Sequence, residues 1–431
     1  MTADHRRVLH LAVPMILSNI TVPLLGLVDT AVIGHLADPA YLGGVAVGSM
    51  LITFLLWLCG FLRMSTTGLI AQAHGRGDHA ALAAWMVKSL TLALLIAVFV
   101  LALQVPIGEL GLSLSGASAA VAEQASHYFY LRIWGLPAAL ANLAILGFLV
   151  GRQDTRGPMA VLILANVLNM LLDLLFVVGF GWQVKGAAGA SVIADYSALA
   201  LGLWLVQRRL PLRALAAACK VPGWSQLLHL NKDILLRTFS LELCFLFITF
   251  QGARLGDTVV AANAVLLNFL LLISYALDGI AYAAEALTGK AIGEQDEAGL
   301  RHWVRLCGQW SLLFALAFSL LFALAGKPII ALLTDLPGVR QVAGQYLGWV
   351  VVLPLVAMWC YLFDGVFIGA TRGRDMRNSM LLAVFGVFFP LWFVSQGLGN
   401  HALWLALTGL MAMRGLSLWW LYRRPGFVFS G

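Results

Sequence analysis

The chain has 431 residues, of which 61% are hydrophobic and 11% are charged, and its mean hydropathy is +0.90. These values exclude a soluble globular protein, because such proteins contain only about 45–50% apolar residues. The net charge of +7 comes from basic residues that fall mostly in short segments between apolar runs. That placement is typical of membrane topology, so we expect no nucleic-acid partner.

The apolar runs predict an all-α polytopic protein embedded in a lipid bilayer. A transmembrane helix needs roughly 20 apolar residues, whereas a barrel strand needs only about ten in an alternating pattern. These runs are long and do not alternate, and lipid offers the backbone no hydrogen-bond partner, so helices are expected. Twelve spans are predicted, at residues 8–34, 41–72, 84–107, 126–150, 158–180, 186–207, 233–253, 258–289, 306–325, 342–369, 378–397 and 401–422.

The first span contains TVPLLGLVDTAVIGHL (residues 21–36), where an acid and a proline stand in apolar surroundings. Asp29 is the only charged residue from Leu11 to Ile33. A carboxylate at mid-bilayer costs about 2.5–3.5 kcal/mol, so such an acid usually faces a cavity. Pro23 lacks the backbone donor of its turn and gives the helix a weak point. We interpret Asp29 as a proton-binding group and Pro23 as a conformational switch. A tolerated kink and a buried acid without a transport role are the alternatives.

The fifth and sixth spans carry further polar residues. In ANVLNMLLDLLFVVGF, Asn166, Asn169 and Asp173 follow a spacing of three and then four residues, which puts them on one helix face. Asp195 lies in the sixth span. With a cytoplasmic N-terminus, the three acids Asp29, Asp173 and Asp195 all fall in the outer half of the membrane. Grouped carboxylates at low dielectric exchange protons near neutral pH, which predicts a proton- or cation-coupling site of Asp29, Asn169, Asp173 and Asp195.

A basic segment at residues 207–232, QRRLPLRALAAACKVPGWSQLLHLNK, divides the chain near its middle. It predicts an N-lobe of residues 1–207, a cytoplasmic linker of residues 208–231 and a C-lobe of residues 232–431. Because six spans is an even number, the lobes enter the membrane in the same direction, as parallel repeats do. A shift of 218 residues matches Leu69, Ala73, Gly75, Asp78, Gly147, Gly151 and Arg156 with Leu287, Ala291, Gly293, Asp296, Gly365, Gly369 and Arg374.

The C-terminal half holds a second set of intramembrane acids: Glu242, Asp278, Glu285 and Asp364. In the eighth span, Tyr275, Asp278, Tyr282 and Glu285 follow spacings of three, four and three residues and share one helix face. None of these acids matches Asp29 under the 218-residue shift, so the fold itself does not require them. They serve either function or ion pairing, and the intramembrane arginines Arg63, Arg132, Arg237 and Arg414 are the candidate partners.

The chain shows no pattern typical of catalysis. The nine histidines have no metal-ligand spacing, and there is no Walker-type loop and no nucleophile elbow. We therefore expect no catalytic residue, no metal and no cofactor, and a transporter rather than an enzyme. Nineteen of the 27 lysines and arginines fall in segments that are internal if the N-terminus is cytoplasmic, so both termini are predicted on the cytoplasmic side of a bacterial inner (plasma) membrane.

Several motifs, in this order, resemble those of the multidrug and toxic compound extrusion (MATE) family. They are PLLGLVDTAVIGHL with Asp29, the NxxxD of Asn169 and Asp173, and VGRQDTRGPM after the fourth span. ALDGIAYAAEALTGKAIG and GAAGASVIADYSA are similar to the DinF-like branch of that family. The resemblance covers essentially the whole chain.

The resemblance implies a V-shaped exporter with two six-helix bundles that works by alternating access. Its substrates would be cationic or amphipathic organic compounds, exchanged for protons or sodium. Asp29, Asn169 and Asp173 then correspond to the cation site of the N-lobe, while Glu242 and Asp364 match acidic positions associated with sodium coupling in another branch. Where related sequences often have threonine, this chain has Ala194 followed by Asp195, which favours protons over sodium.

We therefore expect a monomeric multidrug efflux antiporter. One alternative is a lipid-linked oligosaccharide flippase of the wider superfamily, which would need a cationic cavity for pyrophosphate. The other is a membrane-embedded lipid-modifying enzyme, which would need an acid, a base and a nucleophile, or a metal, close to one membrane surface.

Overall fold

The computed structural model describes residues 3–34, 39–154, 156–210, 214, 218 and 223–427. Every regular element in this part is a helix, which confirms the predicted all-α class. Ten continuous helical stretches of the described chain are long and apolar enough to cross a membrane. Helices α1 (Ala3–Gly34) and α11 (Trp224–Leu255) cover the predicted spans 8–34 and 233–253.

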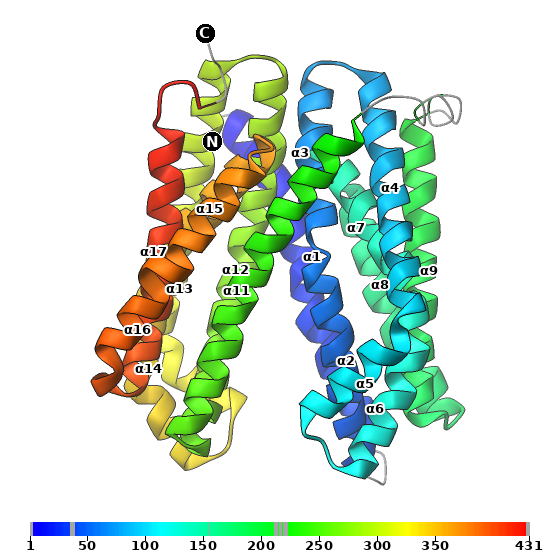
Figure 1. The fold of residues 1–431 in the computed structure, drawn as a ribbon, viewed down its shortest axis with the longest axis vertical. Helices are drawn as coiled ribbons and strands as arrows, with labels where there is room; N and C mark the ends of the chain where they lie inside the picture. Colours follow the sequence, from blue (N-terminus) through cyan, green and yellow to red (C-terminus); the bar gives the residue numbers. More distant parts are fainter. Residues whose placement is uncertain are drawn as a thin grey trace. The chain divides into compact units, whose positions relative to one another are not determined.

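The other helices follow in chain order (Figure 1). Before the middle of the chain they are α2 (Pro39–Leu58), α3 (Phe61–Gly75), α4 (His79–Ala102), α5 (Gln104–Ser115), α6 (Ala119–Arg132), α7 (Leu136–Gly151), α8 (Arg156–Asp173) and α9 (Gln183–Arg209). After it they are α12 (Asp257–Gly293), α13 (Glu297–Leu333), α14 (Pro337–Gly369), α15 (Gly373–Ala383), α16 (Phe389–Ser395) and α17 (Asn400–Tyr422). Short π-helical segments follow α8 and α15, at Leu174–Gly179 and Val384–Phe388.

The predicted span 84–107 differs from the structure, which has two helices there. Helix α4 ends at Ala102, and the separate helix α5 begins at Gln104. Pro106 explains the break, because its ring would crowd the carbonyl of Ala102 in a continuous helix and it has no N–H to donate. Hydropathy averaged over a window of residues does not detect this break between the two helices.

The described chain divides into two compact units. The N-terminal unit contains residues 17–227, and the C-terminal unit contains residues 1–16 together with residues 228–431. Helix α1 therefore contributes its first half to one unit and its second half to the other. Within the predicted linker 208–231, residues 211–213, 215–217 and 219–222 lie outside the described part.

Matching glycines make the same helix contact in the two units. In the N-terminal unit, a Cβ built on Gly147 of α7 would lie 2.5 Å from the carbonyl oxygen of Arg63 in α3. In the C-terminal unit, a Cβ on Gly365 of α14 would lie 2.6 Å from the carbonyl oxygen of Ala281 in α12. Both pairs are related by the 218-residue shift. Small residues let membrane helices approach this closely, so the shift found in the sequence corresponds to a structural repeat.

The turns after α3 and α12 repeat as well. The Asp78 side chain caps α4 by accepting a hydrogen bond from the N–H of Ala81 at 2.9 Å, and Asp296 caps α13 by accepting from Gly299 at 2.8 Å. An N-cap carboxylate satisfies one of the amide groups that a helix start leaves without a partner. These two aspartates therefore begin equivalent helices and are conserved between the repeats for a local reason.

Each unit has its own apolar core. In the C-terminal unit, Phe269, Phe322, Phe388 and Trp404 are at most 2% exposed and belong to one cluster. In the N-terminal unit, a smaller cluster includes Ile33, Tyr128 and Val184 and brings α1, α6 and α9 together. This second cluster lies beside the polar groups considered next.

Candidate functional site

A polar cavity of about 190 Å³ lies inside the N-terminal unit. Its walls come from α1, α2, α6, α8 and α9. The cavity is lined by Leu25, Ser49, Ile52, Thr53, Leu56, Tyr128, Arg132, Ala165, Asn166, Asn169, Ser191, Ala194 and Asp195. Two of the residues predicted for the coupling site, Asn169 and Asp195, therefore face a common space.

Helix α8 supplies two buried amides to this cavity. Asn166 and Asn169 are separated by three residues, so they lie on the same face of the helix. The Nδ2 of Asn166 donates a hydrogen bond to the hydroxyl of Thr21 on α1, and the Nδ2 of Asn169 donates to the hydroxyl of Ser191 on α9 at 2.8 Å. The Oδ1 of Asn169 is buried and accepts no hydrogen bond from the described residues. It can therefore coordinate a cation or accept a hydrogen bond from a protonated group.

Asp173 is the last residue of α8 and is 2% exposed. It lies one turn beyond Asn169, which corresponds to about 6 Å along the helix axis. The π-helical segment Leu174–Gly179 follows directly. Single π-helical turns within α-helices occur often at functional sites. The polar face predicted from the sequence thus leads from the cavity lining at Asn166 and Asn169 to a buried acid at the point where the helix geometry changes.

Asp195 forms an ion pair that crosses from α9 to α6. Its Oδ2 lies 2.8 Å from Nη1 of Arg132, and the Nδ2 of Asn142 donates a hydrogen bond to its backbone carbonyl at 3.1 Å. Gly135 makes room for the pair, because a Cβ there would meet both the Arg132 guanidinium and, at 3.0 Å, the Asp195 carboxylate. The negative charge of Asp195 is therefore already balanced in this structure.

Arg132 was a candidate partner for the acids of the C-terminal half, but it pairs with Asp195 in the N-terminal unit instead. Sequence reasoning also missed Ser191 and Thr21, the two hydroxyls that receive the amides of α8. A usable signal was present for Ser191, since Ser191 and Asp195 are four residues apart and share a face of α9. No local signal existed for Thr21, because its contact with Asn166 joins residues 145 positions apart.

Asp29 and Pro23 both belong to α1, which is helical from Ala3 to Gly34. Pro23 occupies an exposed position and the helix continues through it. The side chain of Asp29 lies outside the part of the chain that the structure describes. Its predicted role as proton-binding group therefore stays a prediction.

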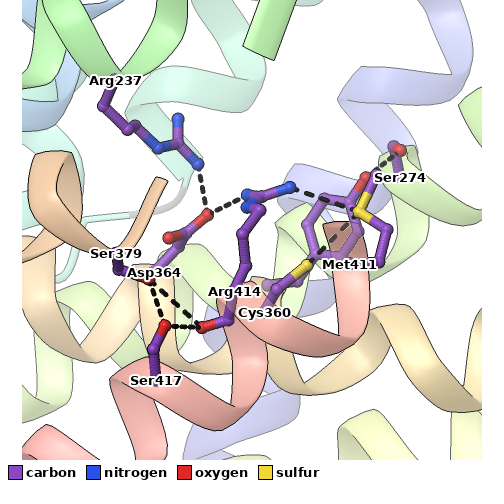
Figure 2. A network of polar contacts seen from close by, with 9 residues as sticks. Arg237, Ser274, Cys360, Asp364, Ser379, Met411, Arg414 and Ser417 are labelled. Atoms are coloured by element: carbon purple, nitrogen blue, oxygen red, sulfur yellow. Dashed lines mark hydrogen bonds and ion pairs between the residues drawn. The ribbon is translucent and has the colours of Figure 1, made fainter. Parts of the chain in front are cut away.

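In the C-terminal unit, Asp364 is held by two arginines (Figure 2). The Asp364 Oδ2 lies 2.6 Å from Nη2 of Arg414 on α17 and also contacts Nη2 of Arg237 on α11. Arg414 extends the network through its Nη1, which lies 3.3 Å from the sulfur of Met411. All three charged side chains are buried. One carboxylate thus has two guanidinium groups in direct contact.

The other acids of this half differ in burial. Glu242 lies partly exposed on α11, Asp278 is partly buried on α12, and Glu285 on the same helix is 1% exposed. Among the described residues, no three His, Cys, Asp or Glu side chains gather as a metal ion would need. The second acidic group of Glu242, Asp278, Glu285 and Asp364 stays a prediction.

The family model MatE matches residues 14–175 and residues 234–394 of the chain. These two segments correspond to the two repeats. The chain is 50% identical to DNA damage-inducible protein F of Escherichia coli over 429 residues, which covers 98% of this chain and 93% of that protein. It is 29% identical to the probable multidrug resistance protein NorM of Deinococcus radiodurans, with 97% of this chain and 94% of that protein covered.

Two solved structures share the fold. A crystal structure of MATE in the straight conformation superposes with a TM-score of 0.87 at 20% identity, covering 96% of this chain and 95% of that one. Another, of MATE in the bent conformation, gives a TM-score of 0.85 at 21% identity, covering 96% and 94%. The two-segment family match and the relative that is 50% identical over nearly the whole chain show that the chain belongs to the MatE family of membrane transporters.

Proposed function

We propose that the protein is a secondary active antiporter that exports cationic or amphipathic organic compounds in exchange for protons by alternating access. The observation that carries this proposal is the half-open polar cavity of the N-terminal unit, with the buried Asn166 and Asn169 in its wall and Asp173 buried one turn beyond. Buried polar groups in a membrane protein are costly and usually mark a substrate or ion pathway. The carboxylate of Asp173 binds the coupling proton together with Asp29, and the amide oxygen of Asn169 accepts a hydrogen bond from the protonated acid.

The coupling ion is a proton in this proposal. Sodium coupling in the C-terminal unit would use Glu242 and Asp364. The two guanidinium groups on Asp364 overcompensate its charge and oppose the approach of a further cation. In the N-terminal unit, Arg132 likewise neutralises Asp195, and the proposal assigns coupling to Asp29 and to Asp173 beside the cavity. Sodium usually takes several oxygen ligands, whereas a proton needs one basic oxygen, so this arrangement favours protons.

The proposed setting is the plasma membrane of a bacterium, with both termini cytoplasmic and the protein acting as a monomer. The lobes are residues 1–207 and 232–431, joined by the linker 208–231. The excess of basic residues in the predicted internal segments supports this orientation.

The test is efflux of a fluorescent organic cation from proteoliposomes, driven separately by a pH gradient and by a sodium gradient. Wild type and Asp29→Asn are compared. Efflux driven by the pH gradient alone and lost in Asp29→Asn is the expected result. If sodium alone drives efflux and Asp29→Asn retains it, coupling belongs to Glu242 and Asp364 instead. If neither gradient moves the dye while a lipid-linked sugar is translocated, the protein is a flippase.

A further inference from the structure

An apolar groove of about 450 Å³ runs between α14 and α17 on the C-terminal unit. Its floor includes Ala412 and Gly415 of α17, and its walls include Trp359 and Trp419. A Cβ on Gly415 would lie 2.8 Å from the Cβ of Trp359, so the helices touch at the floor and separate above it. All the side chains that line this groove are apolar.

A basic pocket of about 570 Å³ lies at the end of α17. Figure 1 shows this end beside the turn that joins α12 and α13. The pocket is lined by Arg301, Arg423 and Arg424 together with one acid, Glu297. Glu297 is paired with Arg301 at 2.5 Å, so two guanidinium groups are left for a ligand.

Stacking on aromatic rings fixes these two guanidinium groups. Arg423 lies over the ring of Trp419 at 4.7 Å, and Arg424 lies over the ring of Trp420 at 3.5 Å. Within the described part of the chain neither arginine contacts a carboxylate. A stacked guanidinium keeps its edge N–H groups available, and their planar fork matches the oxygens of a phosphate.

Trp419 links the groove to the pocket. Trp419 forms part of the groove wall, and Arg423, stacked on that same ring, forms part of the pocket. From Ala412 to Arg423 the helix rises roughly 16 Å at 1.5 Å per residue. This length is about half of the 30 Å hydrocarbon core, which is the depth of one leaflet.

We propose that the groove and the pocket together bind one anionic phospholipid. Its acyl chain occupies the groove against Trp359 and Leu416, and its phosphate contacts Arg423 and Arg424. The match between the groove length and one leaflet favours a lipid over a soluble phosphate. The uncompensated positive charge favours an anionic headgroup over a zwitterionic one, whose ammonium the arginines would repel.

The experiment measures lipid binding to the purified full-length protein by native mass spectrometry. Phosphatidylglycerol and phosphatidylethanolamine of equal chain length are titrated separately. The variants are Arg423→Gln combined with Arg424→Gln, which removes the charge, and Ala412→Phe, which fills the groove. Arg208→Gln is the matched control, because Arg208 is stacked on Trp204 in the same way, at 3.7 Å, in the other unit. Thermal unfolding of each variant verifies that it is folded.

Wild type is expected to bind one phosphatidylglycerol in preference to phosphatidylethanolamine. The double arginine variant should lose about thirty-fold in affinity for phosphatidylglycerol, since each basic side chain near an anionic lipid contributes about a five-fold factor. Ala412→Phe should weaken the binding of both lipids, and Arg208→Gln should leave the affinity for each lipid unchanged.

Three results would overturn the proposal. The first is unchanged phosphatidylglycerol affinity in the folded double arginine variant. The second is displacement of the lipid by millimolar inorganic phosphate, which would identify a phosphate pocket. The third is a dimer whose formation depends on an open groove, which would make the groove an interface between copies.

Discussion

At the residue scale, the sequence predicted which charged residues lie inside the membrane but not how they pair. Asp364, Arg237 and Arg414 were each recognisable as charges within apolar runs. Their contact joins residues 127 and 50 positions apart and depends on how α11, α14 and α17 pack. The pairing of Asp195 with Arg132 was hidden for the same reason. Periodicity along one helix finds a polar face, whereas partners on other helices require the tertiary structure.

The charge network at Asp364 predicts a strong stability effect. Asp364→Asn leaves Arg237 and Arg414 buried without their counter-ion, and breaking a buried ion pair from one side costs about 3–5 kcal/mol. We expect a clear fall in the thermal unfolding midpoint of the detergent-solubilised protein. Asp335→Asn, which removes the exposed partner of Arg340, is the control and should leave the midpoint unchanged. An unchanged midpoint for Asp364→Asn would show that the network does not hold the unit together.

Asp173, the buried acid next to the cavity, is predicted to be needed for transport. Asp173→Asn keeps the size of the side chain but removes its ability to take up a proton. Proton-driven transport should fall about ten- to a hundred-fold, consistent with a lost charged interaction of roughly 1.5–3 kcal/mol, in a variant that thermal unfolding shows to be folded. Glu109→Gln, which removes an exposed carboxylate from α5 in the same unit, is the control. Full pH-driven transport in Asp173→Asn would remove this acid from the coupling site.

At the element scale, the positions of all twelve predicted spans correspond to helices of the described chain, because a membrane span has a long and uniform apolar signal. The separate helix α5 was missed, since one proline decided it. The π-helical segment after Asp173 was missed too, because no residue pattern distinguishes it from α-helix. The repeat was found through a few matched residues, and the structure gives the reason why those residues match: they are close helix contacts and helix caps.

The glycine contacts of the repeat predict equal sensitivity in both units. Gly147→Ala and Gly365→Ala would place a Cβ 2.5 Å and 2.6 Å from backbone carbonyl oxygens, so neighbouring helices must separate. Overpacking of this kind costs about 1–3 kcal/mol, and both variants should unfold at a lower temperature. Gly344→Ala is the matched control, because nothing lies within 4 Å of a Cβ at that helical position. Wild-type stability of Gly147→Ala or Gly365→Ala would contradict the close contact in that unit.

A further prediction concerns Pro23 in helix α1. Pro23→Ala restores the backbone donor of that turn and stiffens the helix. If the helix must change shape during transport, the substitution should slow transport while the protein stays folded. Pro337→Ala is the control, since Pro337 is the first residue of α14, where proline is readily accommodated. Transport at the wild-type rate in Pro23→Ala would mean that the proline is an ordinary tolerated residue.

At the scale of the whole molecule, two repeats share a fold but not their buried acids. The N-terminal unit has a half-open polar cavity next to an acid, whereas the C-terminal unit neutralises Asp364 with two arginines. The fold could be predicted from composition, apolar runs and the internal repeat, since each follows from the bilayer as a solvent. The difference between the units could be predicted only as a difference in residue types. The structural result, a polar cavity beside the buried Asp173 in one unit and an ion-paired Asp364 in the other, could be seen only from the helix packing.

The central claim is exchange of an organic cation for a proton. The most direct measurement records proton movement when a concentration gradient of the cation is the only gradient imposed. Proteoliposomes are loaded with a permeation-resistant organic cation, with equal pH and no sodium on either side, and the lumenal pH is recorded with a trapped dye. Antiport predicts that the lumen acidifies as the cation leaves, and that this acidification is absent in Asp173→Asn. Departure of the cation without a change in lumenal pH, or only after sodium is added outside, would contradict proton antiport.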